Sequence, residues 1–269
     1  MTRVISGVVL AATALGAILF LPFMTLRLIA CLVAGLAADE YARITSGARP
    51  ERAERVEGRG LCRWIVIAVV VYTCWWAAVP APLSIVLLSI FVIVWLAIAV
   101  LRLSRTIQEA AVDLVAPVYI GAPLGMLVAL QMRSGPKATL LLIATIVVSD
   151  SAQYYSGRAF GRRPLAPAIS PKKTVEGALG GVIVGAAFMA IAIPFVFPST
   201  PLVVRVMLSL LIVFLGIVGD LFESRLKRTA GLKDSSELIP GHGGVLDRID
   251  ALLFAIPVFY LAVLQGRVA

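Results

Sequence analysis

Long apolar runs separated by short charged stretches constrain this chain more than any other feature. A soluble domain cannot bury a sequence in which 60% of the 269 residues are hydrophobic. A lipid-crossing segment must satisfy its backbone internally, and we expect these runs to be helices. The sequence therefore predicts an all-α, polytopic membrane protein with about nine transmembrane helices: Val4–Leu21, Leu26–Ala38, Trp64–Val79, Leu83–Leu101, Leu114–Met132, Ala138–Val148, Val175–Phe197, Leu202–Val218 and Val245–Leu264.

The second and sixth of these segments are short for a membrane crossing. Each becomes long enough if its helix continues into the polar residues that follow, Asp39–Ala42 and Asp150–Tyr155. Helices that begin apolar and end polar suit the mouth of a cavity. We expect a polar cavity in the C-terminal half, with residues 1–136 as a helical scaffold and 137–269 as the catalytic region.

The distribution of basic residues predicts the orientation in the membrane. With nine spans, 19 of the 24 Lys and Arg residues lie on one side, and five lie on the other (Arg27, Arg133, Lys137, Arg205 and Arg267). The basic side is cytoplasmic by the positive-inside rule, which predicts an inner (plasma) membrane protein with a cytoplasm-facing site. The net charge of +9 then reflects cytoplasmic loops and anionic substrates, and no nucleic-acid partner is predicted.

One polar stretch, Asp220–Asp250, lies between two apolar runs. Asp220, Glu223/Ser224 and Lys227 share one helix face. Asp247 and Asp250 lie one turn apart near the start of the next helix. Antiparallel helices would place Asp220 and Asp247 at similar depth. Paired carboxylates bind Mg²⁺ when phosphates complete its ligands. The basic side chains nearby suit phosphate oxygens: Lys227, Arg228, Lys233 and Arg248.

A second polar region follows the sixth apolar segment. Asp150, Gln153 and Tyr154 share a helix face, and five basic residues precede the next acidic one: Arg158, Arg162, Arg163, Lys172 and Lys173. Such a basic crossing suits phosphate, although positive-inside bias alone gives the same pattern. The seventh segment carries glycines at intervals of four, Gly177, Gly181 and Gly185, which predict close packing against another helix.

Two motifs carry a resemblance to a known family. The first is Ser224-x-x-Lys227-Arg228, Lys233-Asp234, then His242-Gly-Gly-x-x-Asp247-Arg248-x-Asp250. The second is Asp150-Ser-Ala-Gln-Tyr154 with Gly157-Arg158, Gly161 and Ser170-Pro-Lys-Lys-Thr-x-Glu-Gly177. Both are similar to motifs of the phosphatidate cytidylyltransferases, also called CDP-diacylglycerol synthases. The resemblance covers roughly residues 150–250, and the N-terminal half shares only its hydropathy.

The resemblance implies an enzyme that transfers the cytidylyl group of CTP to phosphatidate within a lipid membrane, with Mg²⁺ as cofactor. The implied metal ligands are Asp220 and Asp247, and a second cation is an open alternative near Asp250 or Asp150. The implied catalytic residues are Asp220, Asp247, Lys227, Arg228 and His242. The implied substrate-binding residues are Asp150, Lys172, Lys173, Ser224, Lys233, Asp234, Gly243, Gly244, Arg248 and Asp250.

Several alternatives stay open at this point. His242 between two glycines suits a phosphate contact, a proton donor to leaving pyrophosphate, or a purely positional role. For Asp234, the alternative to substrate binding is that its carboxylate only balances the charge of Lys233. Another CTP-dependent lipid phosphotransferase, such as a polyprenol kinase, would use similar groups. An ion-coupled transporter would show two related halves, whereas acidic residues within spans cluster after Asp150 here. Homodimer formation is left open.

The charge distribution makes a testable prediction about topology. We expect the loops around Lys172 and Lys233 to face the cytoplasm, since 19 of 24 basic residues fall on that side. Single cysteines placed in each loop should react with a membrane-impermeant thiol reagent only after the cells are opened. Labelling of either loop in intact cells would contradict the orientation.

Overall fold

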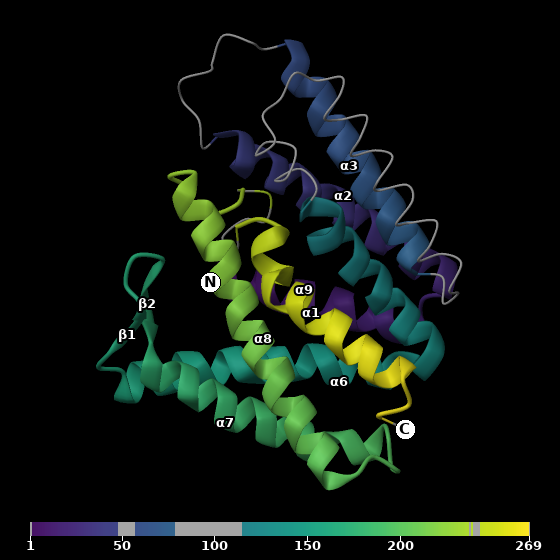
Figure 1. Ribbon diagram of the computed structural model, residues 1–269, viewed down its shortest axis with the longest axis vertical. Helices are drawn as coiled ribbons and strands as arrows, with labels where there is room; N and C mark the ends of the chain where they lie inside the picture. The colour runs from purple at the N-terminus through teal and green to yellow at the C-terminus, as the bar shows by residue number, and fades with distance from the viewer. Residues whose placement is uncertain (1, 48–56, 79–114, 237, 239–242, 269) are drawn as a thin grey trace. The chain divides into compact units, whose positions relative to one another are not determined.

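The computed structural model describes residues 2–47, 57–78, 115–236, 238 and 243–268, and most of them are helical (Figure 1). The predicted span Leu83–Leu101 lies outside the described residues. A π-helix, Pro117–Gly121, precedes α6, and a 3₁₀ turn, Ile193–Phe195, follows α7. The helices are α1 Thr2–Phe20, α2 Phe23–Gly47, α3 Glu57–Ala77, α6 Ala122–Phe160, α7 Val175–Ala192, α8 Leu202–Thr229 and α9 Leu246–Leu264.

Three helical stretches in the described part are long and apolar enough to cross a membrane: Pro117–Phe160, Val175–Phe195 and Leu202–Thr229. Two shorter apolar helices, Ala11–Phe20 and Arg63–Ala77, accompany them. Large apolar side chains on these elements are exposed, as lipid contact requires; Phe195 is 79% exposed and Leu202 is 69% exposed. The chain is therefore a helical membrane protein, and the count of nine spans stays a prediction.

Both short segments extend into polar residues, as the sequence predicted. Helix α2 continues to Gly47, and α6 continues to Phe160, beyond Asp150. The fifth and sixth predicted segments follow one another within the stretch Pro117–Phe160 without an intervening loop. The helix is interrupted only at Gly135, where φ is +76°, immediately before Pro136. Glycine tolerates this left-handed conformation, and the proline that follows has no backbone N–H to donate, so the kink forms here.

A short β-hairpin between α6 and α7 departs from the all-α prediction. Strand β1, Pro164–Ala166, pairs antiparallel with β2, Ser170–Thr174. Helix formation is disfavoured in this segment because it contains three prolines, Pro164, Pro167 and Pro171. The hairpin therefore presents the basic residues of this segment from an extended backbone instead of a helix.

Both ends of the hairpin are attached to the start of α7. The Thr174 hydroxyl accepts a hydrogen bond from the Gly177 N–H at 3.1 Å and caps the helix. The Glu176 carboxylate accepts hydrogen bonds from the N–H groups of Arg162 and Arg163 at 3.0 and 3.2 Å. The position of β2 is therefore fixed by α7.

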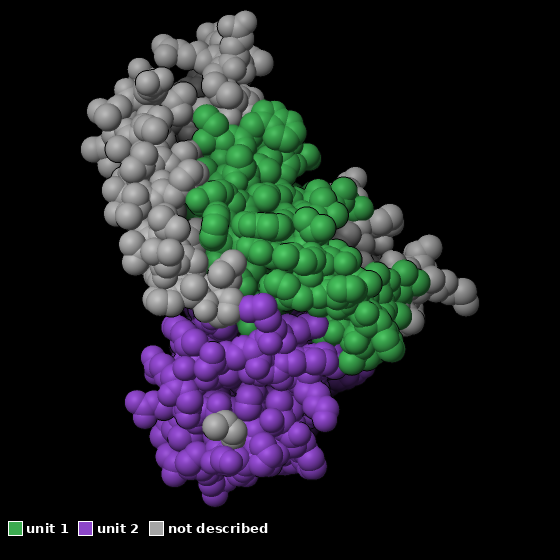
Figure 2. All heavy atoms as spheres, turned by 90° about the vertical axis from the view of Figure 1, so that its right-hand side faces the viewer, with its two compact units in different colours: residues 1–129, 229–247 green, residues 130–228, 248–269 purple. Residues whose placement is uncertain are grey.

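The described chain divides into two compact units, coloured separately in Figure 2. The first unit comprises residues 1–129 and 229–247, and the second comprises residues 130–228 and 248–269. The two units are defined by how the chain packs. The predicted boundary at residue 136 is a different division, between a scaffold and a catalytic region. That functional boundary stays a prediction.

Within the second unit, glycines allow α7 to pack closely against α6, as the intervals of four predicted. A Cβ atom on Gly181 would overlap Gln153 Cγ, and one on Gly185 would lie 2.8 Å from Ser149 Cβ. At Gly177 the same atom would lie 2.8 Å from the Gln153 carbonyl oxygen. The two helices therefore touch through backbone and short side chains over two turns.

A large side chain in this interface should separate the helices. We expect Gly181→Leu to lower stability by about 1–3 kcal/mol or more, because overpacking forces neighbouring backbone to move. The matched control is Ala187→Leu on the exposed face of the same helix. Thermal midpoints and folded yield in detergent compare the two variants, and equal values would contradict the close packing.

Candidate functional site

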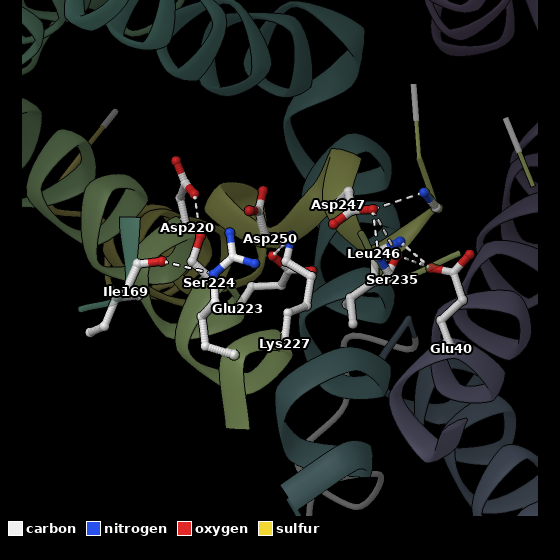
Figure 3. Close-up of polar contacts among 12 residues, drawn as sticks. Glu40, Ile169, Asp220, Glu223, Ser224, Lys227, Ser235, Leu246, Asp247 and Asp250 are labelled. Atoms are coloured by element: carbon white, nitrogen blue, oxygen red, sulfur yellow. Dashed lines mark hydrogen bonds and ion pairs between the residues drawn. The ribbon is translucent and has the colours of Figure 1, made fainter. Parts of the chain in front are cut away.

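Charged side chains gather in the second unit where α6, β2, α8 and α9 carry the two sequence motifs. The Lys173 ammonium on β2 forms an ion pair with the Asp220 carboxylate on α8. Both side chains are partly buried, at 24% and 28% exposed. The Ser224 hydroxyl, one turn along α8, donates to the other oxygen of Asp220 at 3.4 Å (Figure 3). The two motifs, which are separated in sequence, therefore meet at Asp220.

Two more carboxylates lie within electrostatic range of Asp220. Asp150 on α6 and Asp250 on α9 both interact with its charge, and Lys173 and Lys227 offset part of the repulsion. Asp150 also accepts a hydrogen bond from the Gln153 amide at 2.9 Å. Carboxylate oxygens are the ligands that hard divalent cations prefer. Among described residues, no three acidic, His or Cys side chains are already grouped as metal ligands.

Close packing of α8 on α9 explains how Asp220 and Asp250 come near each other. A Cβ atom on Gly219 would lie 2.6 Å from the Asp250 carbonyl oxygen, so only glycine fits there. The rings of Phe222 and Phe254 pack beside this crossing, with centroids 5.5 Å apart. The sequence analysis assigned no role to Gly219, although a glycine directly before an acidic residue within a span was a usable signal.

A buried ion pair lies one turn further along α8. The Lys227 ammonium pairs with the Glu223 carboxylate; the Glu223 residue is 0% exposed and Lys227 is 9% exposed. Helical spacing of four places the two side chains together. Lys227 was predicted as catalytic, whereas Glu223 was left without a role. The structure shows that the charge of Lys227 compensates a buried carboxylate.

The basic residues of the hairpin are mostly at the surface. Lys172 is exposed on β2. Arg228 contacts the turn of the hairpin, where its Nε donates to the carbonyl oxygen of Ile169, directly before β2, at 3.2 Å. Arg158, Arg162 and Arg163 are exposed at the end of α6 and in the turn after it. Their side chains add positive charge to the hairpin side of the second unit, which suits phosphate.

In the first unit, Asp247 organises the segment that leads into α9. Its Oδ2 atom accepts hydrogen bonds from the Ser235 N–H at 3.0 Å, the Ser235 hydroxyl at 2.9 Å and the Gly244 N–H at 2.8 Å. Gly243 has φ of +79°, and a Cβ atom there would lie 2.6 Å from the same oxygen. The two predicted glycines therefore let the backbone close around Asp247.

Glu40 on α2, which the sequence analysis did not single out, contacts the same segment. Its Oε1 accepts from the Ser236 hydroxyl at 2.6 Å and the Val245 N–H at 3.0 Å. Its Oε2 accepts from the Ser235 hydroxyl at 2.9 Å and the Leu246 N–H at 2.8 Å (Figure 3). Glu40 therefore acts as the N-terminal cap of α9 from a distant helix.

The remaining predicted site residues are at the surface or outside the described part. Lys233 and Asp234 are exposed in the segment after α8, and Arg248 is exposed in the first turn of α9. His242 lies outside the described residues. The assignment of Asp220 and Asp247 to one cation stays a prediction, because the two residues belong to different compact units.

Comparison with known proteins gives consistent matches. The model of the cytidylyltransferase family matches residues 1–265. A phosphatidate cytidylyltransferase of Pseudomonas aeruginosa is 35% identical over 96% of this chain and 94% of its own length. Proteins of the same name from Aquifex aeolicus and Haemophilus influenzae are 44% and 48% identical. Each of those two alignments spans about half of both chains. The alignment with the Aquifex protein covers 48% of this chain and 48% of the relative. The alignment with the Haemophilus protein covers 45% of this chain and 44% of the relative.

The Glu223–Lys227 pair makes a prediction that separates a structural role from a catalytic one. Lys227→Met removes the ammonium that compensates a buried carboxylate, and we expect it to cost about 3–5 kcal/mol. The double variant Glu223→Gln/Lys227→Met should recover most of that stability, measured by thermal midpoint and folded yield in detergent. A double variant as unstable as the single one would contradict this account.

Proposed function

The chain belongs to the cytidylyltransferase family, and we propose that it is an enzyme that transfers the cytidylyl group of CTP to phosphatidate. The products are CDP-diacylglycerol and pyrophosphate. The names of the relatives support the substrates. The observation that carries the proposal is that Lys173 of one motif and Ser224 of the other both contact Asp220, on elements of a helical membrane protein. Charged groups in such a position mark function.

The reaction needs little acid–base chemistry from the protein. A phosphate oxygen of phosphatidate attacks the α-phosphorus of CTP, and the bond from this phosphorus to the oxygen bridging to the β-phosphorus breaks. The electron pair of that bond leaves with pyrophosphate. The second pKa of a phosphate monoester is about 6, so the lipid nucleophile is largely dianionic at neutral pH. The protein must mainly bring two anions together and align them.

Basic residues around the hairpin are suited to that task. We assign Lys172, Lys173 and Arg228 to the phosphates of CTP, since the two lysines lie on β2 and Arg228 contacts the hairpin turn directly before it. The ion pair with Asp220 holds the Lys173 ammonium in position before a substrate arrives. Lys227 would contribute a positive charge held in one place, without moving toward the phosphates, because it is buried in an ion pair with Glu223. Arg248 in the first turn of α9 adds a further cation for phosphate.

The residues also fit a divalent cation, which we propose to be Mg²⁺. Asp220 already accepts a positively charged group, the Lys173 ammonium, and Asp150 and Asp250 supply further negative charge nearby. We retain Asp220 and Asp247 as the proposed ligands, with Asp250 or Asp150 available to a second cation. When bound, the metal would neutralise phosphate charge and stabilise the charge that develops at the α-phosphorus.

We further propose nine transmembrane helices in the plasma (inner) membrane, with a polar cavity open to the cytoplasm. The distribution of basic residues supports this orientation. It would place the hairpin on the side where CTP is available, while phosphatidate and the lipid product remain in the bilayer.

Two labelled nucleotides test the reaction directly. Purified protein in detergent is given phosphatidate, Mg²⁺ and CTP labelled at either the α- or the γ-phosphorus, and the lipid extract is counted. Cytidylyl transfer places only the α-label in lipid, whereas a CTP-dependent lipid kinase would place only the γ-label there. We expect α-label incorporation that a chelator abolishes. Incorporation of the γ-label would reject the proposed reaction.

Replacement of the proposed metal ligands makes a second prediction. Asp220→Asn and Asp247→Asn each remove one charge and keep the side-chain size, and Mg²⁺ tolerates little loss of its ligand geometry. We expect both single variants and the double variant to fall to a similar residual kcat, because ligands of one cation act as a unit. Additive losses, or a single variant near the parental rate, would count against a shared cation.

A further inference from the structure

We propose that Glu40 is a positioning residue for the transfer reaction, acting through the segment 235–245 that leads into α9, of which the structure describes residues 235–236, 238 and 243–245. The inference rests on the proposed function, since it concerns the residues assigned to that site. Glu40 lies on α2, in the N-terminal half of the chain, where neither motif occurs. Its contacts are with Ser235, Ser236 and the residues that begin α9.

Glu40 is buried, so its carboxylate depends on these contacts to replace hydrogen bonds to water. The residue is only 3% exposed, and its two carboxylate oxygens accept four hydrogen bonds, three from this segment and one from Leu246, the first residue of α9. A buried carboxylate is costly unless such donors surround it. Because all four donors come from this segment and the first residue of α9, Glu40 and that part of the chain hold each other in place.

The N-terminus of α9 is occupied by this carboxylate. Helix N-termini with glycines before them often bind phosphate through free N–H groups. Here the N–H groups of Val245 and Leu246 donate to Glu40, and that of Gly244 donates to Asp247. The start of α9 is therefore capped by protein carboxylates: two of these N–H groups hold Glu40, and the third holds Asp247.

The Ser235 hydroxyl connects Glu40 to Asp247. Its oxygen lies 2.9 Å from both Glu40 Oε2 and Asp247 Oδ2. One hydroxyl proton can be donated to only one of them at a time. Gly244 closes the same cluster, since a Cβ atom there would overlap Ser235 Oγ and would lie 2.5 Å from Glu40 Oε2. Any change at Glu40 is therefore transmitted directly to the carboxylate of Asp247.

Partners of this kind have a measurable effect on an active site. Groups that orient a metal-binding or catalytic side chain typically change activity or metal affinity by about 10–100-fold when replaced. We expect Glu40→Gln to lower kcat per folded molecule by at least roughly tenfold. The glutamine amide keeps the size of the carboxylate, but its NH₂ group cannot accept the hydrogen bonds that the N–H and hydroxyl groups around Glu40 donate. Glu40→Asp keeps the charge on a shorter side chain and should recover part of the loss.

Trypsin provides a readout that does not depend on activity. Lys233 is exposed two residues before Ser235, so cleavage after it reports how firmly the segment is held. In the full chain in detergent, we expect Glu40→Gln to be cleaved there about tenfold faster or more, because hydrogen bonds to a charged group are lost. The control is Asp39→Asn, on the same helix, whose carboxylate pairs with Arg43 and Arg63. Its cleavage rate and kcat should stay within about twofold of the parent.

The outcomes separate this inference from the proposed function. A parent chain that transfers no cytidylyl group rejects the proposed reaction, and the tryptic comparison then decides alone whether Glu40 holds the segment. An active parent with parental kcat in Glu40→Gln, or cleavage no faster than in Asp39→Asn, overturns the positioning role. If Glu40→Gln does not fold, Ser235→Ala takes its place, because it removes the shared hydroxyl and leaves the α9 cap. Parental kcat in that variant also overturns the inference.

Discussion

Charge compensation inside apolar surroundings is the constraint on which this structure depends. Among the described residues, three buried or partly buried carboxylates have specific partners: Asp220 pairs with Lys173, Glu223 pairs with Lys227, and Glu40 accepts hydrogen bonds from donors that precede and begin α9. A partner is needed because moving a charge out of water has a large unfavourable free energy, which only close pairing and hydrogen bonding can offset. The helices can therefore keep these groups only in arrangements that bring both partners together, and this restricts how the chain can fold.

Glycine contacts are the second requirement, because charged partners on different helices meet only if the backbones approach closely. Gly181 and Gly185 bring α7 against α6, and Gly219 brings α8 against α9 next to Asp250. Small residues at helix contacts are the usual solution in lipid, where the hydrophobic effect gives helices no reason to associate. In the second unit, the glycines allow a short distance between helix backbones, and this short distance brings the charged side chains near one another.

The sequence predicted those features that depend on residues close together in the chain. Apolar runs predicted the helices, and intervals of four predicted the α6–α7 contact. The polar stretch Asp220–Asp250 and the second motif selected Asp220 and Lys173, which the structure pairs. Family membership was predicted from the same motifs. The hairpin was missed because its prolines also suit an ordinary loop. Glu40 was missed because its donors lie 195 to 206 residues away, and no periodicity reports a contact across that separation.

That separation has a consequence for biosynthesis. Ribosomes add roughly 5–20 residues per second, so Ser235 is made about 10–40 s after Glu40. During this interval α2 carries a carboxylate whose donors do not yet exist, and water must solvate it. Glu40 can therefore reach its final environment only after the first residue of α9 has been synthesised. A chain truncated before residue 235 would keep the Glu40 carboxylate without any of these four donors.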